Sequence, residues 1–218
     1  MRKIYFSLAV AFAMFIYGSY NALLVFPPIS SPTNPPMEEL YRNVFFHVPI
    51  NASAYLGFTI TLGASILYLR TRKLSYDLIA SKAAKIAVLF TTFTLLTGMV
   101  WAKAAWGAYW NWDPRETTAL IMWFVYLGYF ALREAMPAGE PRARASAVLG
   151  IFGYASGIFT LLSTRIYFSL HPKTLGQVME PEMGMTLGLM ITAAIIVFLN
   201  LVYLEIRLER LKEKVIRG

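Results

Sequence analysis

The sequence contains no cysteine and few charged residues, and each of these absences narrows what the protein can be. Without cysteine it has no disulfides, thiolate metal ligands or cysteine nucleophile, and it cannot hold a covalent c-type haem of its own. Only 15% of the 218 residues are charged and 57% are hydrophobic, whereas an ordinary soluble domain has about 25% charged residues. This composition excludes a cytosolic globular enzyme, a disordered protein and a disulfide-stabilised secreted domain.

A nucleotide-binding domain is also missing. No G-x-x-x-x-G-K-[ST] phosphate-binding loop occurs in the sequence, and the segments between apolar stretches are too short to hold such a domain. We therefore expect that the protein does not hydrolyse ATP by itself. No internal repeat or long linker divides the chain, so residues 1–218 are expected to form a single membrane domain.

Six apolar segments are long enough to cross a bilayer, whose hydrocarbon core of about 30 Å requires about 20 helical residues. The sequence therefore predicts an all-α, polytopic membrane protein with six transmembrane helices. The first segment is too long for a signal-peptide core of about 7–15 residues, and no small-residue cleavage site follows it, so we expect a retained helix. The six spans are approximately Tyr5–Phe26, Pro49–Leu69, Ala84–Trp101, Thr117–Leu132, Ala145–Ser163 and Gly184–Leu204.

The distribution of Lys and Arg predicts the orientation of these spans. If both termini are cytoplasmic, only five of the 20 basic residues fall in outer segments, namely Arg42, Lys103, Arg115, Arg165 and Lys173. The other fifteen then lie inside, as the positive-inside rule requires. The net charge of +8 is explained in this way by contact with anionic lipid, and no nucleic acid is needed to account for it.

The two histidines of the chain, His47 and His171, fall on the same outer face in this topology. The outer segments are residues 27–48, 102–116 and 164–183. Each histidine could simply be a polar residue at the membrane interface. Two neutral imidazoles on one face could also ligate a haem iron axially or hold a soft or borderline metal. Haem is the better match, because the porphyrin supplies four further nitrogens, whereas a zinc site here would lack ligands.

The second outer segment, 102–116, is unusually rich in tryptophan. Four of the five tryptophans of the chain lie between positions 101 and 112. An aromatic belt at the interface is the simple interpretation. The alternative is a flat apolar platform for a planar ligand such as a porphyrin. Trp106 and Trp110 are four residues apart, so a short helix would place both on one face.

Asp113 begins the pattern Asp-Pro-Arg-Glu in front of an apolar stretch. This pattern predicts a helix start with Asp113 as N-cap, Pro114 as the first helical residue and Glu116 at the third position. Arg115 would then lie in the first turn, where the helix dipole disfavours a cation. It could meet an anion such as a haem propionate, or extend to the interface as a membrane-flanking Arg often does.

The string Trp106-Gly107-x-x-Trp110-x-Trp112-Asp113-x-Arg115 resembles the tryptophan-rich "WWD" signature of the CcmC family of cytochrome c maturation, also called haem exporter protein C. The resemblance extends to two flanking motifs. Tyr41-Arg42, followed by His47-Val48-Pro49, is similar to the first histidine loop of that family, and His171 to the second. The length and the six spans agree, so the resemblance covers nearly the whole chain. One departure is Glu116, where the family leads us to expect an apolar residue.

This resemblance implies a function and a set of site residues. The family binds haem at the outer membrane face, so His47 and His171 would be axial ligands of a non-covalent, transient haem b. The loop 102–116 would hold one edge of the porphyrin. The remaining cofactor-binding residues implied are Arg42, Trp106, Trp110, Trp112, Asp113 and Arg115.

The resemblance also implies partners and a location. In the inner membrane, the protein would present haem at the periplasmic face to a membrane-anchored haem chaperone. It would work with separate ABC transporter subunits and a small one-span membrane partner. Because no nucleophile is paired with a base in the sequence, we expect a delivery factor and not an enzyme. Two alternatives stay open, a cytochrome c synthase or haem lyase and a ligand-free subunit of an ABC exporter.

Overall fold

A computed structural model of the protein describes residues 2–27, 40–171 and 179–217. Most of the proline-rich part of the first outer segment (28–39) and the segment 172–178 with Lys173 lie outside the described residues. The described chain contains no strand and forms six long helices, with a π-helical turn η1 (Asn21–Val25) after the first and a 3₁₀ turn η2 (Tyr41–Asn43) before the second. The six are α1 (Arg2–Tyr20), α3 (Val44–Thr71), α4 (Leu74–Trp106), α5 (Pro114–Ala135), α6 (Glu140–Ile166) and α7 (Pro181–Arg217).

The predicted all-α membrane fold is confirmed, and five of the six predicted spans each fall within one of these helices. The first, Tyr5–Phe26, extends past the end of α1 at Tyr20, through η1 and one residue beyond it. Five of the helices in the described residues are long and apolar enough to cross a membrane. Helix α5 is not among them, although its 22 residues match a bilayer in length. Arg115 and Glu116 at its start and Arg133 and Glu134 near its end shorten the uncharged part of this helix to residues 117–132, which also includes polar aromatic side chains.

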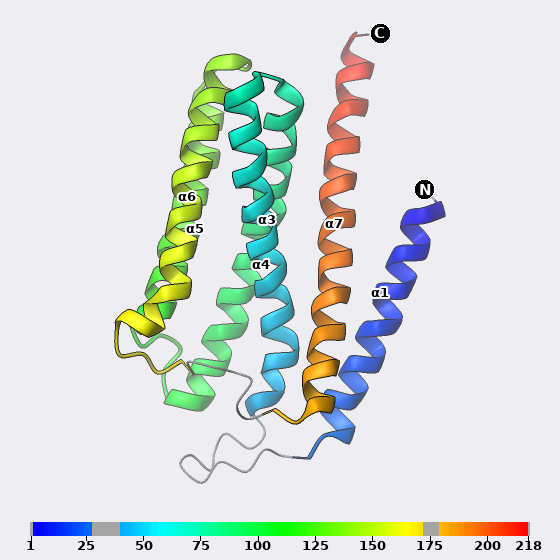
Figure 1. The fold of residues 1–218 in the computed structure, drawn as a ribbon, viewed down its shortest axis with the longest axis vertical. Helices are drawn as coiled ribbons and strands as arrows, with labels where there is room; N and C mark the ends of the chain where they lie inside the picture. Colours follow the sequence, from blue (N-terminus) through cyan, green and yellow to red (C-terminus); the bar gives the residue numbers. More distant parts are fainter. Residues whose placement is uncertain (1, 28–39, 172–178, 218) are drawn as a thin grey trace.

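The helices form one bundle in which α3 and α4 lie between the α5–α6 pair and α7, and α1 lies outermost (Figure 1). The first residues of α1 and the last residues of α7 lie at the same end, which we call the terminal end. The opposite end holds residues 107–113 and 167–171, and we call it the loop end. Both termini therefore lie on one side of the bundle (Figure 1), and their cytoplasmic location stays a prediction.

Helix α7 is longer than expected, because it continues through the charged segment 205–217 that the sequence shows as a tail. Its charges are matched by α4: Lys82 lies 2.9 Å from Glu209, and Lys85 lies 2.8 Å from Glu205. These pairs hold the turns of α7 around Glu205 and Glu209 against α4, beyond the apolar stretch.

Small residues let the central helices approach closely, as is common in membrane bundles. Phe58 of α3 stacks on Tyr126 of α5 with ring centroids 4.0 Å apart. Gly153 of α6 lies beside the same tyrosine, and a Cβ at this position would be 3.0 Å from its ring. The centre of the bundle is therefore tightly packed.

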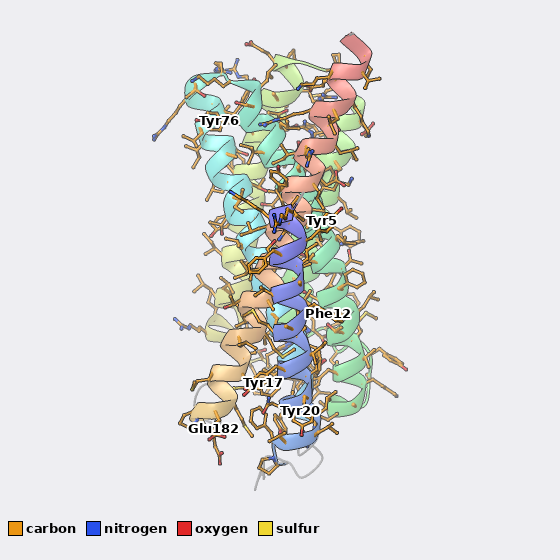
Figure 2. All side chains as sticks on the ribbon, turned by 90° about the vertical axis from the view of Figure 1, so that its right-hand side faces the viewer. Tyr5, Phe12, Tyr17, Tyr20, Tyr76 and Glu182 are labelled. Atoms are coloured by element: carbon orange, nitrogen blue, oxygen red, sulfur yellow. The ribbon has the colours of Figure 1, made fainter. Side chains whose placement is uncertain are left out.

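Helix α1 packs mainly on α7 and leaves a broad aromatic face uncovered (Figure 2). Only Ala11 and Gly18 of this helix are buried, whereas Phe12 and Tyr17 are 67% and 59% exposed. Such a face is expected for an outer helix that contacts lipid.

Candidate functional site

His47 lies in the first turns of α3, because that helix begins at Val44 and not at Pro49. The prediction that His47 lies in the outer segment 27–48, before the second helix begins, is therefore wrong. Proline is favoured at a helix start, which is why the sequence suggested a boundary at position 49. The 3₁₀ turn η2 precedes Val44 and extends the helical segment toward the N-terminus.

The His47 ring is held against helix α4. Its Nδ1 atom lies 2.9 Å from Oγ1 of Thr97. Gly98 gives the ring its space, since a Cβ at that position would be 3.2 Å from Cε1 of His47. The Thr97 hydroxyl and the space left by Gly98 therefore fix the orientation of the His47 imidazole.

Helix α4 ends at Trp106, and Gly107 follows in a left-handed conformation with φ +84°. Residues 107–113 contain no helix. The expected short helix carrying both Trp106 and Trp110 on one face is therefore wrong. Glycine readily adopts this conformation and stops the helix, and the sequence signal for this ending was Gly107 itself.

Asp113 is the N-cap of α5, as predicted, and it also binds a second segment. Its side chain, 1% exposed, accepts the backbone N–H of Arg115 at 2.9 Å and the backbone N–H of Leu170 at 2.6 Å. It further accepts the Ser169 hydroxyl at 2.8 Å and pairs with Nδ1 of His171 at 2.9 Å. One carboxylate therefore joins the loop before α5 to the loop after α6.

These contacts set the ionisation of the two partners. Burial raises the pKa of the Asp113 carboxyl, but hydrogen bonds from Leu170, Ser169 and Arg115 outweigh it, so the pKa lies below its ordinary value. Burial lowers the pKa of His171 below its ordinary value, and the attraction of Asp113 offsets only part of this effect. At neutral pH the pair is a carboxylate beside a neutral imidazole, the form that can ligate a metal.

His47 and His171 line one cavity of about 280 Å³ between α3, α4, α5 and α6 at the loop end. Trp110, Arg115 and Glu116 also line it. Its deeper wall carries hydroxyl and amide groups from Asn51, Tyr55, Thr91, Thr94 and Thr160, and its apolar surface includes Val48, Leu95, Met99 and Met122. The structure thus brings together the two histidines that the sequence separates by 124 positions.

The four clustered tryptophans do not form one flat surface. The Trp106 ring meets the His171 ring edge-to-face with centroids 5.1 Å apart, and meets Trp101 at 4.9 Å. Trp110 lines the cavity and contacts Trp112 edge-to-face at 5.9 Å. Trp112 itself is 74% exposed and has φ +56°. Each tryptophan therefore has a different position relative to the cavity.

The charged residues near the site also differ in position. The Arg115 side chain lines the cavity, and its guanidinium forms no hydrogen bond with any part of the chain that the structure describes. Glu116 accepts the backbone N–H of Asn111 at 3.0 Å, which folds the tryptophan loop back onto α5. Arg42 donates to the carbonyl oxygens of Ala22 and Phe26 and does not line the cavity, so here it stabilises the end of η1.

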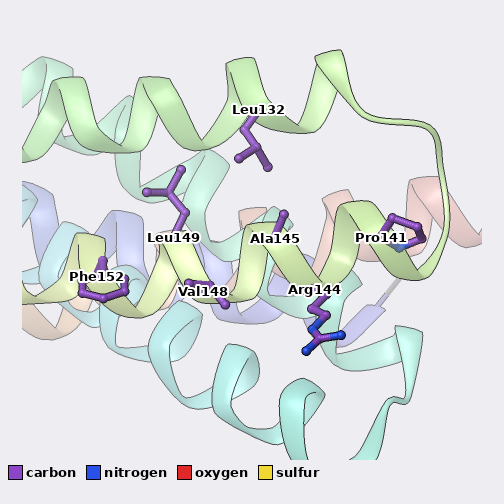
Figure 3. A pocket seen from close by; sticks show the side chains of 7 residues that line it. All are labelled: Leu132, Pro141, Arg144, Ala145, Val148, Leu149 and Phe152. Carbon is purple, nitrogen blue, oxygen red and sulfur yellow. The ribbon is translucent and has the colours of Figure 1, made fainter.

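A second hollow, of about 500 Å³, lies near the terminal end on α5 and α6 (Figure 3). It is lined by Leu132, Pro141, Arg144, Ala145, Val148, Leu149 and Phe152. Val148 and Phe152 are 43% and 69% exposed, and Arg144 is the only ionisable group on its walls. This surface suits contact with lipid and lacks metal ligands.

Comparison with known proteins supports the resemblance seen in the sequence. Residues 2–217 match the family described as heme exporter protein C. A heme exporter protein C from Paracoccus denitrificans is 37% identical over 120 residues, which are 55% of this chain and 48% of that protein. A putative cytochrome c biosynthesis ccmC-like mitochondrial protein from Marchantia polymorpha is 39% identical over 104 residues, 48% of this chain and 46% of that protein.

A related group is matched over a shorter segment. A cytochrome c biogenesis protein CcsA from a Synechococcus species is 39% identical over 85 residues, which are 38% of this chain and 28% of that protein. In the first two comparisons the matched segment spans about half the length of the relative.

Proposed function

The chain belongs to the heme exporter protein C family, and we propose on this basis that it binds haem reversibly and hands it on during cytochrome c maturation. The observation that carries the proposal is that its only two histidines line one cavity. Two imidazoles that line the same cavity are a suitable pair of axial ligands for a haem b that is held without a covalent bond. Haem is here the cargo of the protein.

The rest of the cavity is compatible with this cargo. Trp110 offers an indole to the porphyrin, and the Arg115 guanidinium can pair with a propionate. At about 280 Å³ the cavity would receive the iron and one edge of the ring. An open site of this kind allows capture and release, which a delivery factor needs.

We further propose the location and the partners implied by the family resemblance. The cavity would face the periplasm from the inner membrane, since the positive-inside rule puts the loop end outside. The recipient would be a membrane-anchored haem chaperone. Separate ABC transporter subunits would supply energy, because this sequence has no phosphate-binding loop, and a small one-span membrane protein would complete the assembly.

Two other functions make different predictions. The first is a cytochrome c synthase, which would attach haem to a C-x-x-C-H peptide without other proteins; the similarity to a protein named for cytochrome c biogenesis keeps it open. A ligand-free exporter subunit would show no haem absorption after purification from haem-replete cells. The cavity that both histidines line supports haem binding over a ligand-free exporter subunit.

The test is an absorption spectrum of the full chain in lipid nanodiscs, loaded with ferric haem. We expect a low-spin bis-histidine spectrum that becomes high-spin in both His47→Gly and His171→Gly. Added imidazole should restore the low-spin form in each, and the double variant should not retain haem. Tyr109→Phe is the matched control, because Tyr109 is 55% exposed in the same loop and does not line the cavity. A low-spin spectrum that persists in either single variant would contradict the ligand pair.

A further inference from the structure

The two histidines of the cavity are held through Nδ1 by different kinds of acceptor. For His47 the acceptor is Oγ1 of Thr97, a neutral hydroxyl, at 2.9 Å. For His171 it is Oδ1 of Asp113, a carboxylate, also at 2.9 Å. We infer that His171 is the retained axial ligand of the haem and His47 the ligand that leaves first. This inference rests on the proposed function and adds the order in which the two iron–nitrogen bonds open.

The tautomer of His47 follows from the surroundings of Thr97. Its Oγ1 donates within α4, where it lies 2.8 Å from the carbonyl oxygen of Phe93 and 3.2 Å from that of Thr94. A hydroxyl has a single proton, so toward His47 the oxygen can only accept. Nδ1 of His47 therefore carries the N–H, and its lone pair is on Nε2.

The tautomer of His171 follows from the chemistry of its partner. An ionised carboxylate only accepts hydrogen bonds, so Nδ1 of His171 carries the N–H and Nε2 the lone pair. Both histidines thus offer the same nitrogen to an iron atom. What differs between them is the group behind the ring.

That group changes the strength of the iron bond. A carboxylate behind a metal-ligating histidine raises the basicity of the ring, and a hydrogen bond to an ionised acceptor is about twice as strong as one between neutral groups. Arg115, Ser169 and Leu170 also donate to Asp113, but these donors are neutral backbone or hydroxyl groups that leave its charge in place. His171 is therefore the stronger electron donor, and the bond to His47 is the weaker one.

Release then begins as a ligand exchange on the His47 side. The bond between iron and Nε2 of His47 breaks, and a ligand of the recipient donates an electron pair to the iron at the same position. The departing nitrogen keeps its own electron pair, so the oxidation state of the iron does not change. Thr97 and Asp113 are positioning residues in this scheme, because each acts on the iron through a histidine.

Carbon monoxide tests the order of opening in the haem-loaded full chain. At saturating concentration it binds ferrous haem at the rate at which the weaker histidine leaves. We expect Thr97→Val to raise this rate about 2- to 10-fold, the effect of losing one neutral hydrogen bond. Thr97→Ser is the matched control and should keep the wild-type rate. Asp113→Asn should leave the rate within about twofold of wild type, because the His171 bond is not the one that breaks first.

A vibrational readout identifies the histidine that remains. After photolysis of the carbon monoxide complex, the five-coordinate iron retains one histidine, and its iron–histidine stretching frequency reports the hydrogen bond at Nδ1. We expect this frequency to fall in Asp113→Asn and to stay unchanged in Thr97→Val. Asparagine is a good N-cap, so the variant keeps the start of α5 and separates the effect on the ring from misfolding.

The inference is overturned if the two variants show each other's expected effects. If Asp113→Asn speeds carbon monoxide binding and Thr97→Val does not, or if the frequency falls only in Thr97→Val, His171 is the ligand that leaves first. A wild-type protein without a bis-histidine spectrum contradicts the proposed function itself. A wild-type protein with a bis-histidine spectrum, in which Asp113→Asn and not Thr97→Val speeds carbon monoxide binding, contradicts only the order of opening.

Discussion

The indole of Trp106 meets the imidazole of His171 edge-to-face, with ring centroids 5.1 Å apart. The contact joins the last residue of α4 to the loop that follows α6, and Asp113 holds the same imidazole through Nδ1. His171 is thus restrained by a ring contact as well as by a hydrogen bond. A ligand fixed in this way loses little conformational freedom when it binds iron.

We predict that Trp106→Ala weakens haem binding about 2- to 10-fold, since an edge-to-face aromatic pair contributes about 0.5–1.5 kcal/mol beyond the area it buries. Trp106→Phe should retain most of the affinity. Equilibrium titration with ferric haem measures both variants. Equal loss in the two would mean that the contribution of Trp106 is not its ring contact with His171.

Trp110 and Trp112 are expected to differ although they are two residues apart. Trp110 lines the cavity, whereas Trp112 is 74% exposed. Trp110→Ala should weaken haem binding by about 2- to 10-fold, and Trp112→Ala should not change it measurably in the isolated protein. Transfer of haem to the chaperone tests Trp112 separately, because an exposed indole can contact a partner. If both variants transfer haem at the normal rate, the tryptophans form an interfacial belt and not a haem surface.

Arg115 is predicted to bind a haem propionate. We expect Arg115→Gln to weaken binding of haem about tenfold, the size of a charge-assisted hydrogen bond of about 1.5 kcal/mol. Binding of the haem dimethyl ester, which has no propionate charge, should be the same in variant and wild type. Arg42 is the other arginine that the family resemblance implies in haem binding, and Arg42→Gln tests it in the same assay. An effect on the diester as large as that on haem would show that Arg115 acts on the fold instead.

The orientation of the bundle can be measured directly, because the protein has no cysteine of its own. We predict that Tyr109→Cys, at the loop end, reacts with a membrane-impermeant maleimide added to intact spheroplasts. Glu140→Cys, at the terminal end, should react only after lysis. The distribution of basic residues requires this result. The reverse labelling pattern would place both histidines on the cytoplasmic side.

Asp113 should make the stability of the haem-free protein depend on pH in acid. Its pKa is lower in the folded chain than its ordinary value, so the unfolded state binds the proton more tightly. The stabilisation is complete above the ordinary carboxyl pKa of about 4 and is lost as pH falls through the folded value. Thermal unfolding of wild type and Asp113→Asn should therefore differ most near neutral pH and converge in acid. If the difference in unfolding temperature between wild type and Asp113→Asn is the same at every pH, the variant loses stability through altered packing and not through the charge of Asp113.

The fold could be largely predicted from the sequence, because a helix that crosses a bilayer requires a long run of apolar residues, and such runs are visible in the sequence. The positions of His47 and His171 on one side followed from the same spans. The N-cap at Asp113 was predictable too, since its signal is local. In each case the relevant information lies within a few neighbouring residues or in simple periodicity.

The contacts that organise the site were not predictable in this way. Asp113 binds Ser169, Leu170 and His171 across 56 to 58 positions, and Thr97 contacts His47 across 50. Threonine inside an apolar helix has no distinctive signal, because its hydroxyl usually bonds its own helix. The length of α4 and the left-handed Gly107 decide where each tryptophan lies, and an i, i+4 pattern alone suggested a helix there that does not form.

The α3–α4 connection consists only of Arg72, in a left-handed conformation, and Lys73. These two helices are therefore a hairpin that can enter the membrane as a unit, and it already carries His47 together with Thr97. The α5–α6 hairpin is flanked by Asp113 on one side and His171 on the other, so it carries the second ligand with its own acceptor. Each half carries one histidine with its own acceptor, and docking of the two halves creates the proposed bis-histidine site. If the protein binds haem as proposed, uptake requires that the two hairpins have docked, and a small separation of the hairpins would divide the site without disturbing either half.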